Sequence, residues 1–470
     1  MQISLINGTF TDQDADFRTS LPINAVAVPL KNDISNGYLR VADGIRSVET
    51  TGMPVGASRG GINWNGTAYR VIGTKLVRID SAGNVTTVGD VGPGGQCSFT
   101  YSFDRLAVAS GKRLYYYNGS TFTQVTDPDL GQVFDVIWVD GYFMTTDGEN
   151  LVVTELNDPS QIDPLKYGSS EADPDPVTGL LKVRNEVYAL NRYTIEVFNN
   201  VGGDNFPFSR VDGAMIPKGC VGTYAKVDFG GAFAFVGSGL NEPCSVYLAD
   251  AANPVKIATR EIETILQKYS EAELSVTVME YREDKINKLI YIRLPNETLV
   301  YDLAATTAIG VPVWYYHTST TAGIAPLRAK DFVYCYGGYQ VADSLDNRLG
   351  VFDNKIATQY GQIVGGQFDT QIIYNASKGV IVNQIDIVGL FGRAELGDDP
   401  VIFVSWTNDG ETWSDERRLR IGKQGERMIR PQIRQSGRFA NWRAYRIRWA
   451  NSAIASYSRL EADLEPLNYG

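Results

Sequence analysis

The chain contains one histidine, His317, and this single residue restricts the chemistry that the sequence can support. One imidazole ring cannot supply the ligands of a multi-histidine metal site, and it argues against a histidine-based triad. His317 directly follows Trp314, Tyr315 and Tyr316, a run of aromatic residues typical of a strand. We therefore interpret His317 as a packed neighbour of aromatic rings.

A second candidate is the acidic run Asp173-Pro-Asp-Pro176, close to Glu171. Its carboxylates could bind a divalent cation. The run lacks the alternating Asp or Asn ligands of a calcium loop, and its prolines are typical of an exposed turn. We interpret it as a solvated loop, and the sequence predicts no metal and no cofactor.

The segment Thr407-Asn-Asp-Gly-Glu-Thr-Trp413 resembles the Asp-box of sialidase propellers, with one residue fewer between Asp409 and Gly410. In those enzymes the motif is a hairpin turn remote from the chemistry. We therefore expect Asp409 and Gly410 to form a turn, and Trp413 to be a core residue.

Arginines concentrate near the end of the chain: residues 411–460 carry a charge of +8 and the remainder carries −19. This cluster could face DNA phosphates in a channel, pair with acidic surfaces of a neighbouring subunit, or be a solvated face. The chain is acidic overall, with a net charge of −11, so we favour the protein interface. The candidate residues are Arg417, Arg418, Arg420, Arg427, Arg430, Arg434, Arg438, Arg443, Arg446 and Arg448.

Arg446 and Arg448 alternate along the chain with Tyr445, Ile447 and Trp449. Successive side chains of a strand point to opposite faces, so we expect both arginines to point away from the core. We also expect them to be free to meet another surface.

The composition predicts an all-β protein with many turns, since glycine occurs 47 times and aromatic residues make up 11% of the chain. Neither a secretory signal nor a stretch of about 18 uncharged apolar residues is evident. Cys97, Cys220, Cys244 and Cys335 lie far apart, and we expect buried, reduced thiols made in a cytoplasm.

Between about residues 58 and 360 a unit of short β-rich runs and tight turns recurs. In one instance Leu106–Ala109 and Leu114–Tyr117 flank Ser110-Gly111, and Asn118-Gly119 follows. Asn-Gly between apolar runs is a strong hairpin signal. Further units begin near residues 179, 221, 277 and 323, a spacing that overlaps that of four-stranded blades. We predict a six- or seven-bladed β-propeller.

One helical insertion is predicted within the propeller, from Arg260 to Tyr281. Its first part has apolar residues at helical spacing, and Ser270 with Glu273 resembles a capping box that starts a second segment. After about residue 365 longer alternating runs predict a C-terminal antiparallel β-sandwich. The expected division is an N-terminal segment at 1–57, which completes the propeller or contacts a neighbouring subunit, a propeller at 58–365, and an Arg-rich sandwich at 366–470.

Short motifs in a shared order make the chain resemble the tail-accessory, or packaged-DNA-stabilisation, family of lambdoid short-tailed phages. No single motif is specific, and their common order over residues 21 to about 302 carries the resemblance, which thins beyond that point. The motifs are Leu21-Pro-Ile-Asn24, Gly37-Tyr-Leu-Arg40, Gly44-Ile45, Ser58-Arg-Gly60, Tyr69-Arg-Val71, Lys218-Gly219, Gly222-Thr-Tyr224, Ser245-Val-Tyr247, Ile257-Ala-Thr259, Glu271-Ala-Glu273, Val278-Met-Glu280, Leu294-Pro295 and Leu299-Val-Tyr-Asp302.

The resemblance implies a tail hub of the virion, a homo-oligomer and by expectation a hexamer. Such a hub lies beneath the portal and its adaptor ring, contacts tailspikes and a tail needle or plug, seals the vertex over packaged DNA, and forms part of the ejection channel. It implies no catalysis, so no active-site residue is carried over. Two alternatives remain: a propeller that binds glycans, and a propeller glycosidase with paired carboxylates at its central channel.

Overall fold

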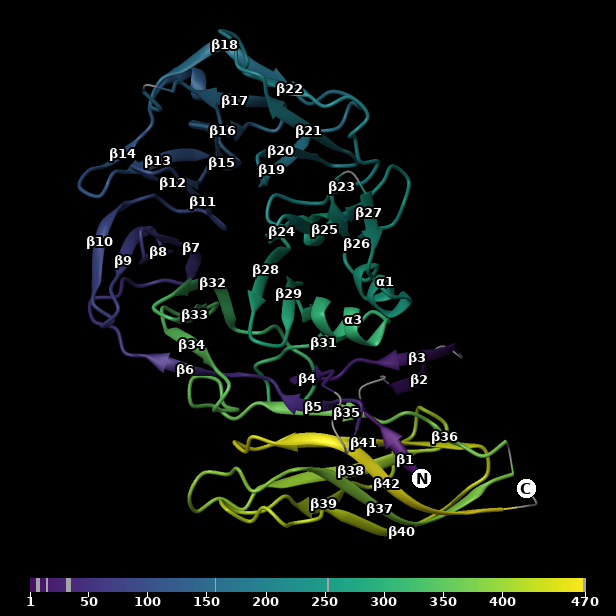
Figure 1. Cartoon of the computed structure of the whole chain (residues 1–470). Coiled ribbons are helices and arrows are strands. Elements are labelled where there is room, and N and C mark those ends of the chain that lie inside the picture. Colours follow the sequence, from purple (N-terminus) through teal and green to yellow (C-terminus); the bar gives the residue numbers. More distant parts are fainter. Residues whose placement is uncertain are drawn as a thin grey trace.

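The computed structural model describes residues 1–5, 9–13, 16–30, 35–156, 158–251, 253–376 and 378–467. Four- and five-stranded sheets are arranged around a central axis, and a two-sheet sandwich lies beside this ring (Figure 1). The prediction of an all-β propeller followed by a β-sandwich is confirmed.

The first four blades follow the order of the sequence, each from an inner to an outer strand. Blade 1 contains β7 (Ser58–Trp64), β8 (Thr67–Ile72), β9 (Lys75–Ile79) and β10 (Val85–Asp90). Blade 2 contains β11 (Ser98–Tyr101), β12 (Leu106–Ser110), β13 (Arg113–Tyr117) and β14 (Phe122–Gln124), and the 3-10 helix Pro128–Leu130 follows it. Blade 3 contains β15 (Asp135–Val139), β16 (Tyr142–Thr146), β17 (Asn150–Thr154) and β18 (Ile162–Ser169). Blade 4 contains β19 (Val177–Val183), β20 (Glu186–Asn191), β21 (Ile195–Asn200) and β22 (Phe208–Arg210).

Three further blades complete the ring, so the propeller has seven. Blade 5 contains β23 (Gly219–Cys220), β24 (Lys226–Phe229), β25 (Ala232–Ser238), β26 (Ser245–Asp250) and β27 (Asn253–Lys256). Blade 6 contains β28 (Val278–Glu283), β29 (Lys288–Arg293), β30 (Thr298–Asp302) and β31 (Trp314–Tyr316). Blade 7 contains β32 (Ala329–Cys335), β33 (Gly338–Asp343), β34 (Leu349–Asp353) and, from the N-terminal segment, β6 (Gly44–Val48).

The strand β6 closes the ring by pairing antiparallel with β34, from Gly44 opposite Asp353 to Val48 opposite Leu349. The strands lie close together at Gly350, where a Cβ atom would overlap the side chain of Ile45. Glycine is therefore required at this position of the closure. Because β6 precedes the first blade and pairs with the last, the two ends of the ring are held together by backbone hydrogen bonds.

The sandwich combines strands from both ends of the chain. One sheet has the order β4-β5-β42-β37-β40 with β1 beside β42, and the other has the order β35-β41-β38-β39 with β36 beside β41. The strands are β1 (Gln2–Ser4), β4 (Ala25–Val28), β5 (Tyr38–Val41), β35 (Gly365–Asp369), β36 (Ile373–Tyr374), β37 (Val380–Leu390), β38 (Val401–Thr407), β39 (Arg417–Arg420), β40 (Gln432–Phe439), β41 (Trp442–Ala450) and β42 (Ser456–Pro466). Between β1 and β4 in the sequence, β2 (Thr9–Gln13) and β3 (Asp16–Ser20) form a separate hairpin. Residues 6–8, 14, 15 and 31–34 of the N-terminal segment lie outside the described residues.

Aromatic side chains join neighbouring blades. The ring centroids of Tyr116 in blade 2 and Phe143 in blade 3 lie 5.1 Å apart. Those of Tyr188 in blade 4 and Phe233 in blade 5 lie 5.0 Å apart. Tilted and edge-on pairs of this kind add to the burial energy of the rings, so the blades are packed against one another as well as paired within themselves.

Three α-helices lie within the described part of the propeller: α1 (Arg260–Leu266), α2 (Glu271–Ser275) and α3 (Leu303–Ile309). The predicted capping box is confirmed, since Ser270 and Glu273 bond each other's backbone amides. The predicted end of the helical insertion at Tyr281 is wrong, because Val278–Glu283 forms the inner strand β28, whose ladder with β29 supersedes helical bonding. Helix α3 was not predicted, although Asp302 caps its start and Gly310, in a left-handed conformation, ends it.

The four cysteines are free, and Cys97, Cys220 and Cys335 are buried as expected. Cys244 is only half-buried, so the expectation of burial is wrong there; it lies 3.8 Å from a guanidinium nitrogen of Arg192. Among the described residues no helix is long and apolar enough to cross a bilayer.

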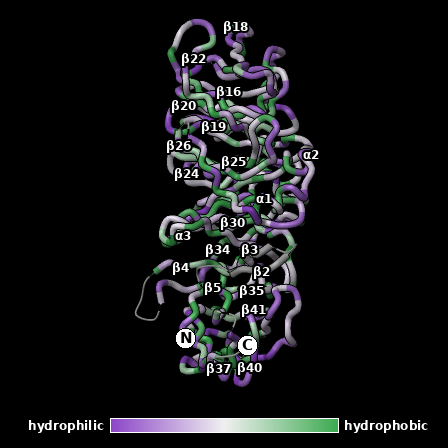
Figure 2. Tube along the Cα trace, turned by 90° about the vertical axis from the view of Figure 1, so that its right-hand side faces the viewer, coloured by the Kyte–Doolittle hydropathy of each residue, from purple (hydrophilic) through white to green (hydrophobic). Residues whose placement is uncertain are grey.

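Turned by 90°, the molecule is a long, narrow column (Figure 2). The outer strand β18 of blade 3 lies at one end, and β37 and β40 of the sandwich lie at the other. Both termini are at the sandwich end.

Candidate functional site

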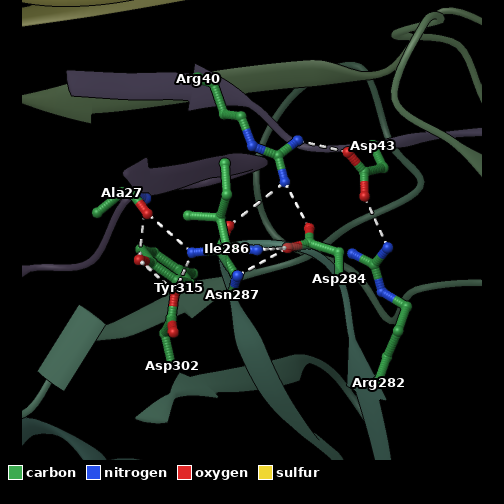
Figure 3. Close-up of polar contacts among 9 residues, drawn as sticks. All are labelled: Ala27, Arg40, Asp43, Arg282, Asp284, Ile286, Asn287, Asp302 and Tyr315. Carbon is green, nitrogen blue, oxygen red and sulfur yellow. Dashed lines mark hydrogen bonds and ion pairs between the residues drawn. The ribbon is translucent and has the colours of Figure 1, made fainter. Parts of the chain in front are cut away.

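A buried ionic cluster joins the sandwich to the propeller where the chain passes from β5 to β6 (Figure 3). Asp43 lies in this crossover, between Arg40 of β5 and Arg282 of β28 in blade 6. Its carboxylate bonds the guanidinium groups of both arginines, at 2.6 Å for Arg282. The side chains of Asp43 and Arg282 are each only 4% exposed. Arg40 also reaches Asp284, in the connection between β28 and β29 of blade 6, at 2.9 Å. One carboxylate thus pairs with an arginine from each domain.

Beside this cluster a second set of polar contacts joins β4 to blade 6 (Figure 3). The Asn287 side chain donates to the carbonyl of Ala27 at 2.9 Å and to Asp302 at 2.6 Å. The backbone amide of Ala27 donates to the Tyr315 hydroxyl at 2.9 Å, and that hydroxyl donates to Asp302 at 3.3 Å. Asp302 also caps α3, so the same carboxylate orders the helix and the contact between domains.

The electrostatics of this junction depend on burial and on the two arginines. Burial alone would raise the pKa of Asp43, but the positive charges of Arg282 and Arg40 outweigh it and lower that pKa to about 2. Asp302 has no cationic partner among the described residues, and burial raises its pKa despite its hydrogen bonds. Asp43 is therefore a carboxylate at neutral pH.

His317 lies beside the junction, and its ring contacts two tyrosine rings. The ring centroids are 5.4 Å apart for Tyr291, which is edge-on, and 6.4 Å apart for Tyr315, which is stacked. Its interpretation as a packed aromatic neighbour is confirmed, and the side chain is buried. Burial, together with the positive charge of Arg282, lowers its pKa to about 3. The ring is consequently neutral at physiological pH.

Asn24 adds a third connection. Its side-chain amide donates to the carbonyls of Thr318, in the propeller, and Gly365, at the start of the sandwich. Its side-chain oxygen accepts from the amide of Thr318 at 3.0 Å. The residue adopts a positive φ of 48°, a conformation that asparagine tolerates better than most residues. The N-terminal segment therefore contacts both domains at several buried points.

The arginine cluster falls into three groups. Four members are paired with carboxylates of the same sandwich, so they are not free charges. The pairs are Arg420 with Asp399 at 2.9 Å, Arg430 with Asp386 at 2.6 Å, Arg446 with Asp369 at 2.8 Å and Arg448 with Glu416 at 2.7 Å.

Arg446 and Arg448 do lie on the face opposite the buried Tyr445, Ile447 and Trp449. The expectation that they are free is wrong, because each makes a two-pronged bond to one carboxylate. The Asp369 side chain is fully buried, so Arg446 supplies its counter-charge.

Two other arginines connect the sheets of the sandwich. Arg417 of β39 donates to the carbonyl of Arg434 on β40 at 3.0 Å. Arg443 of β41 donates to the β40 carbonyls of Ser436, at 2.6 Å, and Arg438, at 3.1 Å. Arg443, a predicted candidate for a subunit or DNA-channel interface, is only 2% exposed, so its side chain is not available at such a surface. These bonds satisfy carbonyls of an edge strand that pairs with no further strand.

A third group has no carboxylate partner among the described residues. Arg418 lies on β39, Arg434 and Arg438 lie on β40, and Arg427 lies in the connection between these strands. All four are exposed, and Arg434 bonds only the amide oxygen of Gln432. Both strands are edge strands of their sheets, so the unpaired cations gather at one edge of the sandwich.

The segment that resembles an Asp-box forms the predicted turn. Asp409 accepts bonds from the amides of Glu411 and Thr412 and from the Thr412 hydroxyl, and these bonds lower its pKa to about 2. Trp413 is not a core residue as expected: it is half-exposed, and the Arg446 guanidinium covers its ring at 3.7 Å.

The acidic run near residue 173 is an exposed loop, as interpreted. Asp175 accepts bonds from the backbone amides of Tyr193, at 2.6 Å, and Thr194, at 3.0 Å, and so orders the adjoining blade. Within the described part of the chain, no group of three or more histidine, cysteine or acidic side chains is placed to hold a metal ion.

The inner strands of the blades line a cavity of about 440 Å³ at the centre of the propeller. Most of its carboxylates are already bonded: Asp135 to Lys226 at 2.5 Å, and Glu280 to Arg293. Asp331 accepts from Gln96 at 2.7 Å. Asp228 is exposed at this cavity and has no side-chain partner among the described residues. Four carboxylates thus line the cavity, and three of them are bonded to neighbouring side chains.

A closed propeller joined to a sandwich through buried ion pairs defines a two-domain all-β protein. Its family follows from sequence models that cover both domains. The chain belongs to the Bacteriophage P22 Gp10 family, whose β-propeller model matches residues 1–357 and whose β-sandwich model matches residues 365–465. The family predicted from the order of the short motifs is thereby confirmed.

A curated relative agrees with this family. The chain is 28% identical over 440 residues to the tail hub protein gp10 of Salmonella phage P22, covering 89% of both chains. Among solved structures, the Neurospora crassa Pan2 WD40 domain has a TM-score of 0.41 at 11% identity, with 63% of this chain and 89% of that domain covered. The N-terminal domain of Nup159 has a TM-score of 0.40 at 10% identity, with 72% and 100% covered.

The junction was the part of the site that sequence reasoning missed. Arg40 and Gly44 end and begin two of the motifs that carried the resemblance, and Asp43 lies directly before the second. A charged residue beside two such motifs was the available signal. Its partner Arg282 could not be read from the sequence, because Arg282 lies in blade 6 and comes near only in the closed ring.

Proposed function

We propose that this chain is a structural tail hub of a short-tailed phage, made in the host cell and built into the virion tail. The match to both domains of the P22 Gp10 family, together with the near full-length similarity to a tail hub protein, carries the proposal. A hub must transmit load between its neighbours, and the buried ion pairs at Asp43 supply a stiff connection between its two domains.

In this role the chain acts as a ring, with six copies as the expected number. It joins the portal-adaptor ring to tailspikes and to a tail needle or plug. Its contribution is mechanical and not catalytic: many weak contacts around the ring retain the DNA until ejection. The channel of the assembled ring would bring DNA near the protein without reading its sequence.

Mass photometry of the purified chain, with and without a portal-adaptor complex, tests the hub. We expect a new species whose mass corresponds to the complex plus a ring of this chain. The chain alone in the same buffer is the control. If no such species forms across the tested range of salt and protein concentration, the hub proposal fails.

Retention of DNA tests the sealing role separately. Particles assembled without this chain should package DNA and then lose it, because no other component resists the internal pressure after the packaging motor leaves. Nuclease-sensitive DNA released over time would measure the loss. Stable, full heads in its absence would contradict sealing while leaving the joining role intact.

A further inference from the structure

Two surface regions of opposite charge lie at the two ends of the column, one edge of the sandwich and blade 3 of the propeller. The sandwich end contains residues 417–438, with seven arginines, one lysine and one glutamate. The propeller end contains blade 3 with its flanking loops, residues 122–176, with twelve acidic residues and one lysine. Blade 3 and the strand β40 lie at opposite ends in both views (Figures 1 and 2).

The basic end retains uncompensated charge after its internal pairs are counted. We call it the arginine edge; it consists of the exposed side chains of Arg418, Lys423, Arg427, Arg434 and Arg438, none of which pairs with a carboxylate in the described part of the chain. Met428, 94% exposed, lies among them. Arginine and methionine are both enriched at protein interfaces.

The acidic end is similarly uncompensated. Of its twelve carboxylates only Asp135 and Glu155 form ion pairs within the described residues. Leu165, 76% exposed on β18, is an exposed apolar side chain on this surface. We call this surface the blade 3 acidic surface; its exposed or half-exposed carboxylates without a cationic partner include Asp129, Asp147, Glu149, Asp163, Glu171 and Asp173.

We propose that the arginine edge of one copy docks on the blade 3 acidic surface of a second copy. The two surfaces are complementary in charge, which favours a second copy as the partner. Each carries several unpaired charges of one sign around an exposed apolar side chain. Because the two surfaces differ, the contact is heterologous, and repeated contacts of this kind close into a ring when the rotation between copies allows it. This inference rests on the proposed hub and identifies a contact by which its copies assemble.

Charge reversal at each end, measured by sedimentation velocity of the full chain at tens of micromolar, tests the contact. The basic-end variant is Arg418→Glu with Arg438→Glu, and the acidic-end variant is Glu149→Lys with Glu171→Lys. We expect the parent to self-associate at about 50 mM salt and to dissociate at about 500 mM, because exposed charges are screened. Each variant should associate more weakly by roughly tenfold or more.

The decisive chain carries all four substitutions, because its reversed ends are complementary again and it should regain self-association. Arg78→Glu with Lys268→Glu is the matched control: it changes the net charge as the basic-end variant does, at exposed positions elsewhere, and should associate like the parent. A parent that stays monomeric at both salt concentrations overturns the contact. So does an acidic-end variant that assembles normally.

DNA is the competing occupant of the arginine edge, and fluorescence anisotropy with a short duplex distinguishes it. If the basic-end variant loses DNA affinity while its self-association is unchanged, the arginine edge binds phosphates and the copy-to-copy contact is overturned. Joining to the portal-adaptor complex, measured separately, tells failure of this contact apart from failure of the hub.

Discussion

Replacing Asp43 by asparagine should destabilise the chain by about 3–5 kcal/mol, the usual cost of breaking a buried ion pair by removing one partner. The substitution keeps the shape of the side chain, but it leaves Arg282 buried without its carboxylate and Arg40 with Asp284 alone. Since these arginines belong to different domains, we expect the contact between propeller and sandwich to weaken first. Urea unfolding followed by tryptophan fluorescence measures the loss.

Asp353→Asn is the matched control. Asp353 of β34 pairs with Arg46 of β6 at 3.3 Å, so this ion pair also involves the N-terminal segment. The Arg46 side chain, however, is 61% exposed. An exposed pair of this kind contributes at most about 1 kcal/mol. Equal losses for the two variants would show that the buried cluster at Asp43 does not hold the domains together.

The blades could be predicted from the sequence because their information is local. Two apolar runs around the predicted turn at Ser110-Gly111 determine a hairpin without reference to distant residues. In the structure the turn lies one residue later: Ser110 pairs with Arg113, and Gly111 and Lys112 adopt positive φ angles of 55° and 64°. The closing pairing of β6 with β34 joins residues from opposite ends of the propeller sequence, and no local pattern indicates it.

For the arginine cluster, the sequence predicts the direction of a side chain but not its partner. Alternation along Trp442–Ala450 correctly gave the face of Arg446, because side-chain direction in a strand depends only on position. Whether that arginine is free depends on Asp369, which belongs to the neighbouring strand β35. Reversing Arg446 would therefore bring two carboxylates together, and it tests folding before it tests an interface.

The predicted end of the helical insertion was wrong because a helical pattern and a strand pattern overlap there. Val278–Tyr281 continues the apolar spacing of the helices before it, but the same residues fit an inner strand. The strand forms because it completes blade 6 beside β29, and that pairing also buries Met279 between neighbouring blades. The local sequence is compatible with both a helix and a strand, and tertiary packing favours the strand.

Lowering the pH should destabilise the chain through its single histidine, by roughly 3 kcal/mol between pH 7 and pH 4. Burial lowers the pKa of His317 to about 3 in the folded chain, against an ordinary value of 6.5. Below pH 6.5 the unfolded chain therefore takes up a proton that the folded chain excludes until about pH 3. Stability is complete above pH 6.5 and falls as the pH decreases through this window.

The comparison with His317→Phe isolates this effect, because phenylalanine keeps a ring beside Tyr291 and Tyr315 and cannot take up a proton. Carboxylates titrate in both chains and cancel in the difference: Asp43, with its pKa near 2, loses its contribution only below about pH 4, and Asp302, with a raised pKa, acts in the opposite direction. We expect urea midpoints of the two chains to diverge steadily from pH 6.5 to pH 4. Parallel profiles would mean that the folded chain admits the proton, and that the ring is not sealed beneath the junction.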